Sequence, residues 1–185
     1  MKIPKRFMRL FASLNTLILI MGIVYNDAVS SAPSGEIQTL TVAYLYNFMK
    51  LSEWPTKALG NELNLCITQE GDLAKELDSL AGKEAQNHTL KIKRLVQGDN
   101  AKECQLLFLP NEEKPLRMQE WLNTLQEVPV LTVSDQDGFL DQGGMIALVN
   151  DSGRLQFEVN LERVEHTGIK LSSKMLQIAR DVRGK

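Results

Sequence analysis

Two short apolar runs with a helical segment between them constrain the fold of this chain most. The runs "LLFL" at 106–109 and "VPVLTV" at 128–133 are almost continuously apolar, as strands covered on both faces are. The segment between them carries apolar residues at helical spacing, namely Met118, Trp121, Leu122 and Leu125. A strand, a helix and a second covered strand predict parallel neighbours in one sheet with helices on its faces.

The same alternation of strand and helix continues on both sides of this unit. Upstream, residues 36–51 repeat apolar positions at helical spacing before Pro55, and "LNLCIT" at 63–68 and "TLKIKRLV" at 89–96 have strand patterns. Downstream, "MIALV" and "RLQFEV" flank the turn formers of residues 150–153, which predicts an antiparallel hairpin. We therefore expect one α/β domain with a mostly parallel sheet, helices on both faces and a C-terminal antiparallel β-hairpin.

Capping residues predict where the other helices start. Asp72, Asn111 and Asn160 each precede a short helical pattern, and their side-chain oxygens can accept from the first free backbone N–H groups. The last helix is expected to start at Ser172 or Ser173. Its apolar positions recur at helical spacing through Val182, and we expect the helix to end with Arg180, Arg183 and Lys185, whose positive charges suit the negative pole of a helix.

The first 30 residues have the order of regions found in secretory signal peptides. A basic start is followed by a mainly apolar stretch at 10–24 and by small residues at Ala28 and Ser30. We expect cleavage after Ser30, which leaves 31–185 as the exported domain with no membrane span. A retained N-terminal anchor is the alternative, although the apolar stretch is short for a spanning helix.

The charge balance argues against a nucleic-acid partner. The whole chain has 21 basic and 23 acidic residues. Removal of residues 1–30 takes away four basic residues and one acid, which leaves 17 against 22 and a net charge of −5. A domain of that sign lacks the basic surface that binds a phosphate backbone.

Two cysteines, Cys66 and Cys104, lie in the expected domain. In an exported protein an even cysteine count favours a disulfide, and two buried thiols are the alternative. A metal site is not indicated, because the chain has no CxxC pair and both His88 and His166 lie far from the cysteines in sequence.

The segment "VSDQDGFLDQGG" at 133–144 combines aspartates with a glycine pair, a composition found in calcium and phosphate sites. With Gly138 at the glycine position of an EF-hand loop, the first ligand position falls on Val133 and the last on Gly144. The pair Gly143–Gly144 matches no phosphate-binding fingerprint and precedes a strand rather than a helix. We therefore predict no metal and no cofactor, and we assign the aspartates to a turn.

The sequence contains no arrangement typical of a catalytic nucleophile. It has no GxSxG motif, and Leu171 stands where an SxxK motif ending at Lys174 requires serine. Glu162 and His166 are four residues apart on a short helix, but such pairs are ordinary helix neighbours. We predict that the protein is not an enzyme.

Three segments together resemble the YfiR-like family of small exported bacterial proteins. They are "AYLYNFMKLSEWP", "VLTVSDQDGFLDQGGMIALV" and "FEVNLERVEHTGIKLSSKMLQIA", in that order and spacing. The resemblance extends from about residue 37 to residue 181. It implies a periplasmic repressor that binds the periplasmic sensor domain of an inner-membrane diguanylate cyclase. Envelope or reducing stress then relieves repression, and cyclic di-GMP output and biofilm formation rise.

The resemblance also implies roles for particular residues. Cys66 and Cys104 match the family's common disulfide, whereas a second pair found in some members has no counterpart in this chain. Gly143 and Gly144 are expected to have a structural role, letting the backbone enter the hairpin closely. We place the partner surface on the hairpin and the segment after it, with contacts from Gln156, Glu158 and Arg163. The alternative for these three is that they are ordinary solvated residues.

A second functional class remains open at this stage. The chain could be a periplasmic small-ligand-binding component that serves a membrane kinase or cyclase. Its pocket would then lie between the sheet and the aromatic residues of the first helix. The oligomeric state stays open between a monomer and a homodimer.

Overall fold

The computed structural model describes residues 34–69 and 71–184, which all fall within one compact unit, Ala32–Lys185. The predicted signal peptide therefore lies outside the described residues. Within the described ranges, no helix combines the length and the apolar character needed to cross a membrane.

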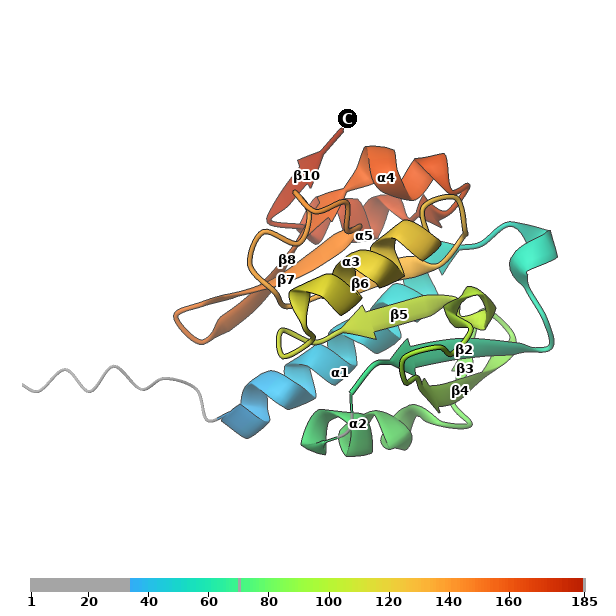
Figure 1. Ribbon diagram of the computed structural model, residues 1–185, viewed down its shortest axis with the longest axis horizontal. Helices are drawn as coiled ribbons and strands as arrows, with labels where there is room; N and C mark the ends of the chain where they lie inside the picture. Colours follow the sequence, from blue (N-terminus) through green and yellow to red (C-terminus); the bar gives the residue numbers. More distant parts are fainter. Residues whose placement is uncertain (1–33, 70, 185) are drawn as a thin grey trace, which may run out of the picture. The chain divides into compact units, whose positions relative to one another are not determined.

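Short helices and strands alternate along the chain after one long helix (Figure 1). The α-helices are α1 (Ser34–Leu51), α2 (Asp72–Leu77), α3 (Pro115–Thr124), α4 (Leu161–His166) and α5 (Ser173–Ile178). The 3-10 turns are η1 (Thr56–Ala58), η2 (Asp78–Leu80) and η3 (Ala101–Glu103). The strands are β1 (Ser52–Glu53), β2 (Glu62–Ile67), β3 (Glu84–Ala85), β4 (His88–Arg94), β5 (Leu106–Leu109), β6 (Leu131–Ser134), β7 (Ile146–Asp151), β8 (Arg154–Asn160), β9 (Lys170–Leu171) and β10 (Asp181–Arg183).

One eight-stranded sheet organises the described residues, with the strand order β10-β8-β7-β6-β5-β2-β4-β3. Its five central strands, β4, β2, β5, β6 and β7, are mutually parallel. The predicted mostly parallel sheet is therefore confirmed. β7 and β8 form the antiparallel hairpin, but β8 is not the edge, because β10 pairs with it in parallel.

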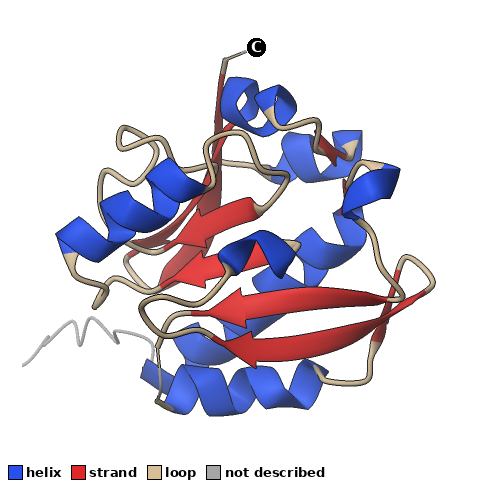
Figure 2. Ribbon diagram, turned by 45° about the vertical axis from the view of Figure 1, so that its right-hand side comes forward, coloured by secondary structure: helices blue, strands red, loops and turns tan. Residues whose placement is uncertain are grey.

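Apolar side chains form a core on each face of the sheet, and helices contribute to both cores (Figure 2). In β5, Leu106 and Phe108 belong to the core that receives α1, whereas Leu107 and Leu109 belong to the core that receives α3. All four β5 residues are buried, as the continuous apolar run predicted. The alternating directions of strand side chains produce this two-sided burial.

The aromatic residues of α1 fill the space between that helix and the sheet. Phe48 is 1% exposed, and its ring centroid lies 5.1 Å from that of Phe157 on β8. The Tyr44 ring lies 5.6 Å from the same Phe157 ring, and the Tyr44 hydroxyl donates to the Leu155 carbonyl at 3.0 Å. These aromatic side chains of α1 therefore pack in the core.

Two predicted helix starts need correction, and two agree with the structure. Asn111 does not cap α3, which begins at Pro115, a residue that suits the first helical position because it lacks an N–H group. Asp72 is the first residue of α2 rather than its cap. By contrast, the Asn160 side chain caps α4, and the Ser172 side chain caps α5, each accepting from the backbone N–H three residues ahead.

The C-terminal helix ends earlier than predicted. α5 stops at Ile178, and residues 181–183 form strand β10 instead. The change of direction is fixed by the Arg180 N–H group, which donates to the Phe157 carbonyl at 2.8 Å. Val182 then pairs with Val159 of β8. The helical spacing of residues 172–182 was real, but hydrogen bonds to the open edge of β8 replaced the last turn of helix.

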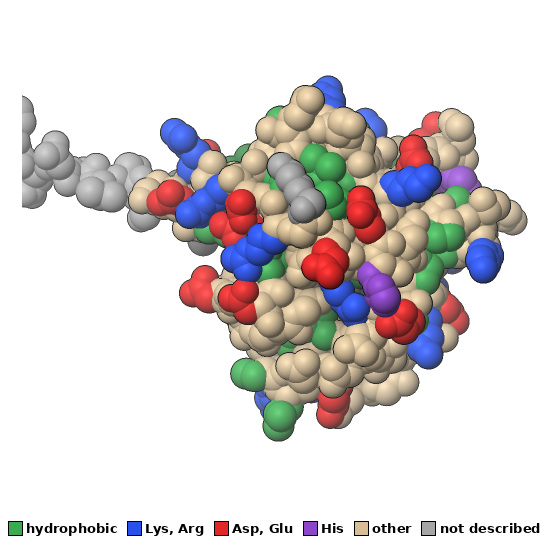
Figure 3. Space-filling model, turned by 90° about the horizontal axis from the view of Figure 1, so that it is seen from above, with side chains coloured by type: hydrophobic (Ala, Val, Ile, Leu, Met, Phe, Trp, Pro, Cys, Tyr) green, Lys and Arg blue, Asp and Glu red, His purple; other side chains and the backbone are tan. Residues whose placement is uncertain are grey.

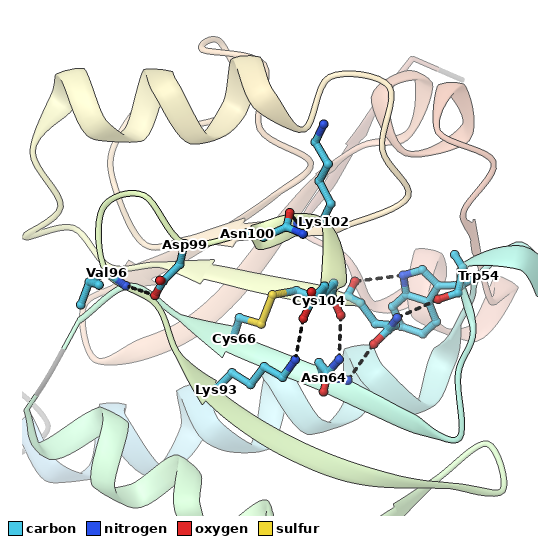
Figure 4. Close-up of a disulfide and its surroundings, with 12 residues drawn as sticks. Trp54, Asn64, Cys66, Lys93, Val96, Asp99, Asn100, Lys102 and Cys104 are labelled. Atoms are coloured by element: carbon cyan, nitrogen blue, oxygen red, sulfur yellow. Dashed lines mark hydrogen bonds and ion pairs between the residues drawn. A yellow bond between two sulfur atoms is a disulfide. The ribbon is translucent and has the colours of Figure 1, made fainter.

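A disulfide between Cys66 and Cys104 joins β2 to the start of β5, with 6.0 Å between their Cα atoms (Figure 4). Both cysteines are essentially buried. Polar contacts hold Glu103, the residue before Cys104. The Asn64 side-chain amide donates to the Glu103 carbonyl at 2.7 Å, and Lys93 pairs with the Glu103 carboxylate at 3.1 Å. The predicted disulfide is thus present.

Candidate partner-binding surface

The outward side chains of β8 lie on the sheet face opposite α1. Leu155, Phe157 and Val159 are buried, while Gln156 and Glu158 alternate with them and are half-buried. The alternation follows from the period of two in a strand. Gln156 and Glu158 therefore share one face of the hairpin, beside β10.

Glu158 forms ion pairs with two arginines of the same chain. Its carboxylate lies 3.6 Å from Arg180 Nε and 3.7 Å from Arg183 Nη2, and its side chain is 19% exposed. The register of the sheet causes this arrangement, because Asp181 of β10 stands beside Glu158. Glu158 thus holds two arginines in place, and the guanidinium groups are what the surface presents.

Arg183 connects this edge to the loop between β6 and β7. Its Nη1 atom donates to the Asp141 carboxylate at 2.6 Å. That hydrogen bond raises the pKa of Arg183 above its ordinary value. The Arg183 side chain is 46% exposed, so it remains accessible from solvent.

The loop before β7 is a packed turn. Gly143 has φ +95°, a conformation that glycine adopts readily. Gly144 lies against the buried Phe139 ring, and a Cβ at this position would stand 2.2 Å from a ring carbon. No cluster of three or more acidic, histidine or cysteine side chains suited to a metal ion occurs in residues 34–69 or 71–184.

Arg163 lies in the first turn of α4, three residues after the last residue of β8. Its backbone N–H donates to the Asn160 side chain at 3.2 Å, and it lines a hollow of about 230 Å³ with Glu162 and His166. The C-terminal strand packs against the same helix, because a Cβ at Gly184 would lie 2.6 Å from Glu162 Cβ. Arg163 therefore belongs to the same end of the sheet as β10.

His166 does not pair with Glu162. Its Nε2 atom lies 2.9 Å from the carboxylate of Glu127, in the segment that follows α3. Both side chains are more than half exposed. This is a surface hydrogen-bond contact between distant segments, and it includes no nucleophile.

We define the β8–β10 surface as Gln156, Glu158, Arg163, Arg180, Arg183 and Asp141. The end of the sheet that carries α4 and β10 intersperses acidic and basic side chains (Figure 3). Sequence analysis missed Arg180 and Arg183 because it assigned them to the end of a helix. It also missed Ile178, the last residue of α5, which is 64% exposed. This residue lies outside the apolar stripe of α5.

Comparisons with known proteins agree with the motif resemblance. No curated protein matches the chain. A family model described as YfiR/HmsC-like matches residues 38–180, which is most of the 185-residue chain. The matched range includes most of the long helix, the five parallel strands, the disulfide and the β7–β8 hairpin. The chain therefore belongs to the YfiR/HmsC-like family.

Proposed function

We propose that this protein is a periplasmic regulator that represses an inner-membrane diguanylate cyclase by binding its periplasmic sensor domain. The observation that carries the proposal is the family match over residues 38–180, since YfiR-like proteins are regulatory rather than catalytic. The buried disulfide is consistent with an oxidising compartment.

The β8–β10 surface is our proposed contact region. It includes Gln156, Glu158 and Arg163, the three contact residues predicted from the sequence. Arg163 is half-buried, and its side chain makes no hydrogen bond or ion pair with another described residue. A guanidinium with free donors can bind a carboxylate of a partner in a bidentate manner. Glu158 acts indirectly in this proposal, by orienting Arg180 and Arg183.

Deletion of the chromosomal gene followed by complementation tests the proposal. Deletion should raise intracellular cyclic di-GMP, and the wild-type protein should lower it again. Arg163→Glu should fail to restore repression at equal protein level, because it places like charge opposite the partner's acid. Lys91→Glu is the matched control, since Lys91 lies on β4 near the opposite edge of the sheet and its pair with Glu62 is exposed.

Different outcomes test the proposed function and the proposed contact surface. Unchanged cyclic di-GMP after deletion would contradict a role in repressing a cyclase. Full repression by Arg163→Glu would instead keep the function and rule out this surface. Affinity purification of the wild-type protein from solubilised membranes should recover the cyclase, and Arg163→Glu should recover less of it.

A further inference from the structure

The order of the parallel strands creates a crevice at one edge of the sheet. Along the chain the parallel strands are β2, β4, β5, β6 and β7, whereas in space they run β4-β2-β5-β6-β7. The chain therefore leaves β2 in one direction, toward β4, and leaves β5 in the other, toward β6. In open parallel sheets, ligands bind outside the carboxyl ends of the strands at such a switch point.

A cavity of about 150 Å³ lies at this place. Its lining includes Ile67 at the end of β2, Pro110 directly after β5 and Asp135 directly after β6. Thr41 of α1 and the start of α2 close its sides. We call it the switch-point pocket, and a cavity of this size holds a molecule as large as benzene.

Thr41 provides a polar group in the pocket that the fold leaves unused. The residue is 5% exposed, and its hydroxyl makes no hydrogen bond within the described ranges. A helical threonine commonly donates to the carbonyl four residues earlier, as Thr39 does to Gly35 at 3.1 Å. The hydroxyl oxygen is not sealed from solvent, and because Thr41 lines the cavity, this oxygen can accept a hydrogen bond from a bound molecule.

Asp135 brings a carboxylate to the same cavity. Its Oδ1 atom accepts from the Asn111 N–H at 2.8 Å, and the backbone N–H of Asp135 itself also interacts with the carboxylate. Burial nevertheless raises the pKa of this carboxyl, and nearby Glu112 adds to the increase. The carboxylate therefore stands in a site where a positive charge would be stabilising.

The charges of the lining define the kind of ligand. Among the described residues, the titratable side chains that line the cavity are Asp72, Glu112 and Asp135, and none of the described lining residues is a lysine, arginine or histidine. Asp72 already pairs with Lys75 at 3.0 Å. The other two acids are uncompensated, and the described residues form no metal cluster. The apolar side chains of Ile37 and Ile67 provide a surface for a hydrocarbon chain.

We infer that the switch-point pocket binds a small primary alkylammonium ion. The ammonium group donates to the Asp135 carboxylate and to the Thr41 hydroxyl oxygen, and the alkyl chain lies along Ile37 and Ile67. Glu112 adds a second negative charge at the mouth. This site lies at the carboxyl edge of the sheet and does not depend on the proposed function.

Titration of the purified protein with n-butylamine, followed by ¹H–¹⁵N NMR, tests the inference. Amide resonances of Thr41, Gln69 and Asp135 should shift in a saturable manner. A ligand with so few heavy atoms binds in the micromolar range at the tightest, so the titration extends to millimolar concentrations. Butyrate and n-butanol have the same chain length with a negative or neutral head, and they should leave these resonances unshifted.

Matched variants separate the site from general charge attraction. Asp135→Asn and Thr41→Val should each weaken butylamine binding about tenfold or more, the range expected for a hydrogen bond to a charged group. Thr41→Val should leave the melting temperature without ligand nearly unchanged, because the hydroxyl makes no hydrogen bond with another described residue. Asp137→Asn removes an exposed carboxylate in the same loop and should bind as the wild type does.

Three outcomes would overturn the inference. The first is an absence of saturable shifts at the pocket residues. The second is equal binding of butyrate, which would remove the selectivity for cations. The third is an equal loss of affinity in Asp137→Asn and Asp135→Asn, which would show that overall charge attracts the amine.

Discussion

Gly144 has no side chain because the Phe139 ring occupies the space where a Cβ would stand. That Cβ would lie 2.2 Å from the ring, and Phe139 is completely buried, so the ring cannot move aside freely. Gly144→Ala should therefore lower the free energy of unfolding by about 3 kcal/mol, as overpacking a core does. Urea denaturation followed by circular dichroism measures the change.

The neighbouring Gly143→Ala variant is the control for this contact. Nothing lies within 4 Å of a Cβ at Gly143, but its φ of +95° strains any other residue, so a loss of about 1–2 kcal/mol is expected. Combining each variant with Phe139→Leu should relieve only the Gly144 substitution. Equal and additive effects in both combinations would show that the ring contact is not the cause.

Asp135 should make stability depend on pH in the direction opposite to that of a salt-bridged acid. Burial raises its folded-state pKa above the ordinary 3.8, so between these two values the folded state holds more protons than the unfolded state. Its contribution to stability therefore falls as pH rises through that window. Compared with Asp135→Asn, the wild type should show a rising free energy of unfolding as the pH is lowered from 7 through that window, measured by urea denaturation. A difference that stays constant or reverses would contradict this assignment.

Burial was predictable from sequence at residue level, whereas long-range partners were not. Alternation along β8 predicted that Leu155, Phe157 and Val159 face the core, and all three are buried. The pairing of Glu158 with Arg183 depends on a strand that helical periodicity concealed. The approach of Asp141 to Arg183 depends on the sheet order, which no local pattern encodes.

Elements with a long or strongly apolar pattern were predicted well, and their ends were not. The runs that became β5 and β6 were recognised because a strand covered on both faces has no polar side. The strands β1, β3 and β9 have two residues each, too few to show any periodicity. β10 was mistaken for helix because tertiary hydrogen bonds to β8 outweighed a weak local preference.

The disulfide should stabilise the pairing of β2 with β5 as a unit. It joins positions that are 38 residues apart in sequence, and removal of a native bridge in a small exported domain costs about 2–5 kcal/mol. The double variant Cys66→Ala/Cys104→Ala should show that loss in urea denaturation. Complete reduction of the wild type, verified by thiol titration, should produce a similar loss, whereas reductant should leave the double variant unchanged. Wild-type stability that survives complete reduction would refute a stabilising role.

At the scale of the whole molecule, the sheet order separates two surfaces. The sequence predicted a parallel sheet but not that β2 lies between β4 and β5, because strand order depends on how the connecting helices pack. That order places the switch-point pocket beside the central strands and the β8–β10 surface at one edge. A partner could therefore bind the edge while a ligand occupies the crevice, and NMR shifts on butylamine addition should be confined to the crevice.

Export, cleavage and bridge formation should occur together in the whole protein. The first 30 residues have the pattern of a signal peptide, and a buried disulfide persists in an oxidising compartment. Expressed in a Gram-negative host, the full chain should appear in the periplasm with the intact mass of residues 31–185 and no free thiol. A version that lacks residues 2–30 should remain in the cytosol with both thiols reduced.

The competing possibility is a retained anchor, for which the full-length mass would be found in the membrane fraction. Because the anchored form would still have an oxidised bridge, intact mass rather than thiol state decides between cleavage and anchoring.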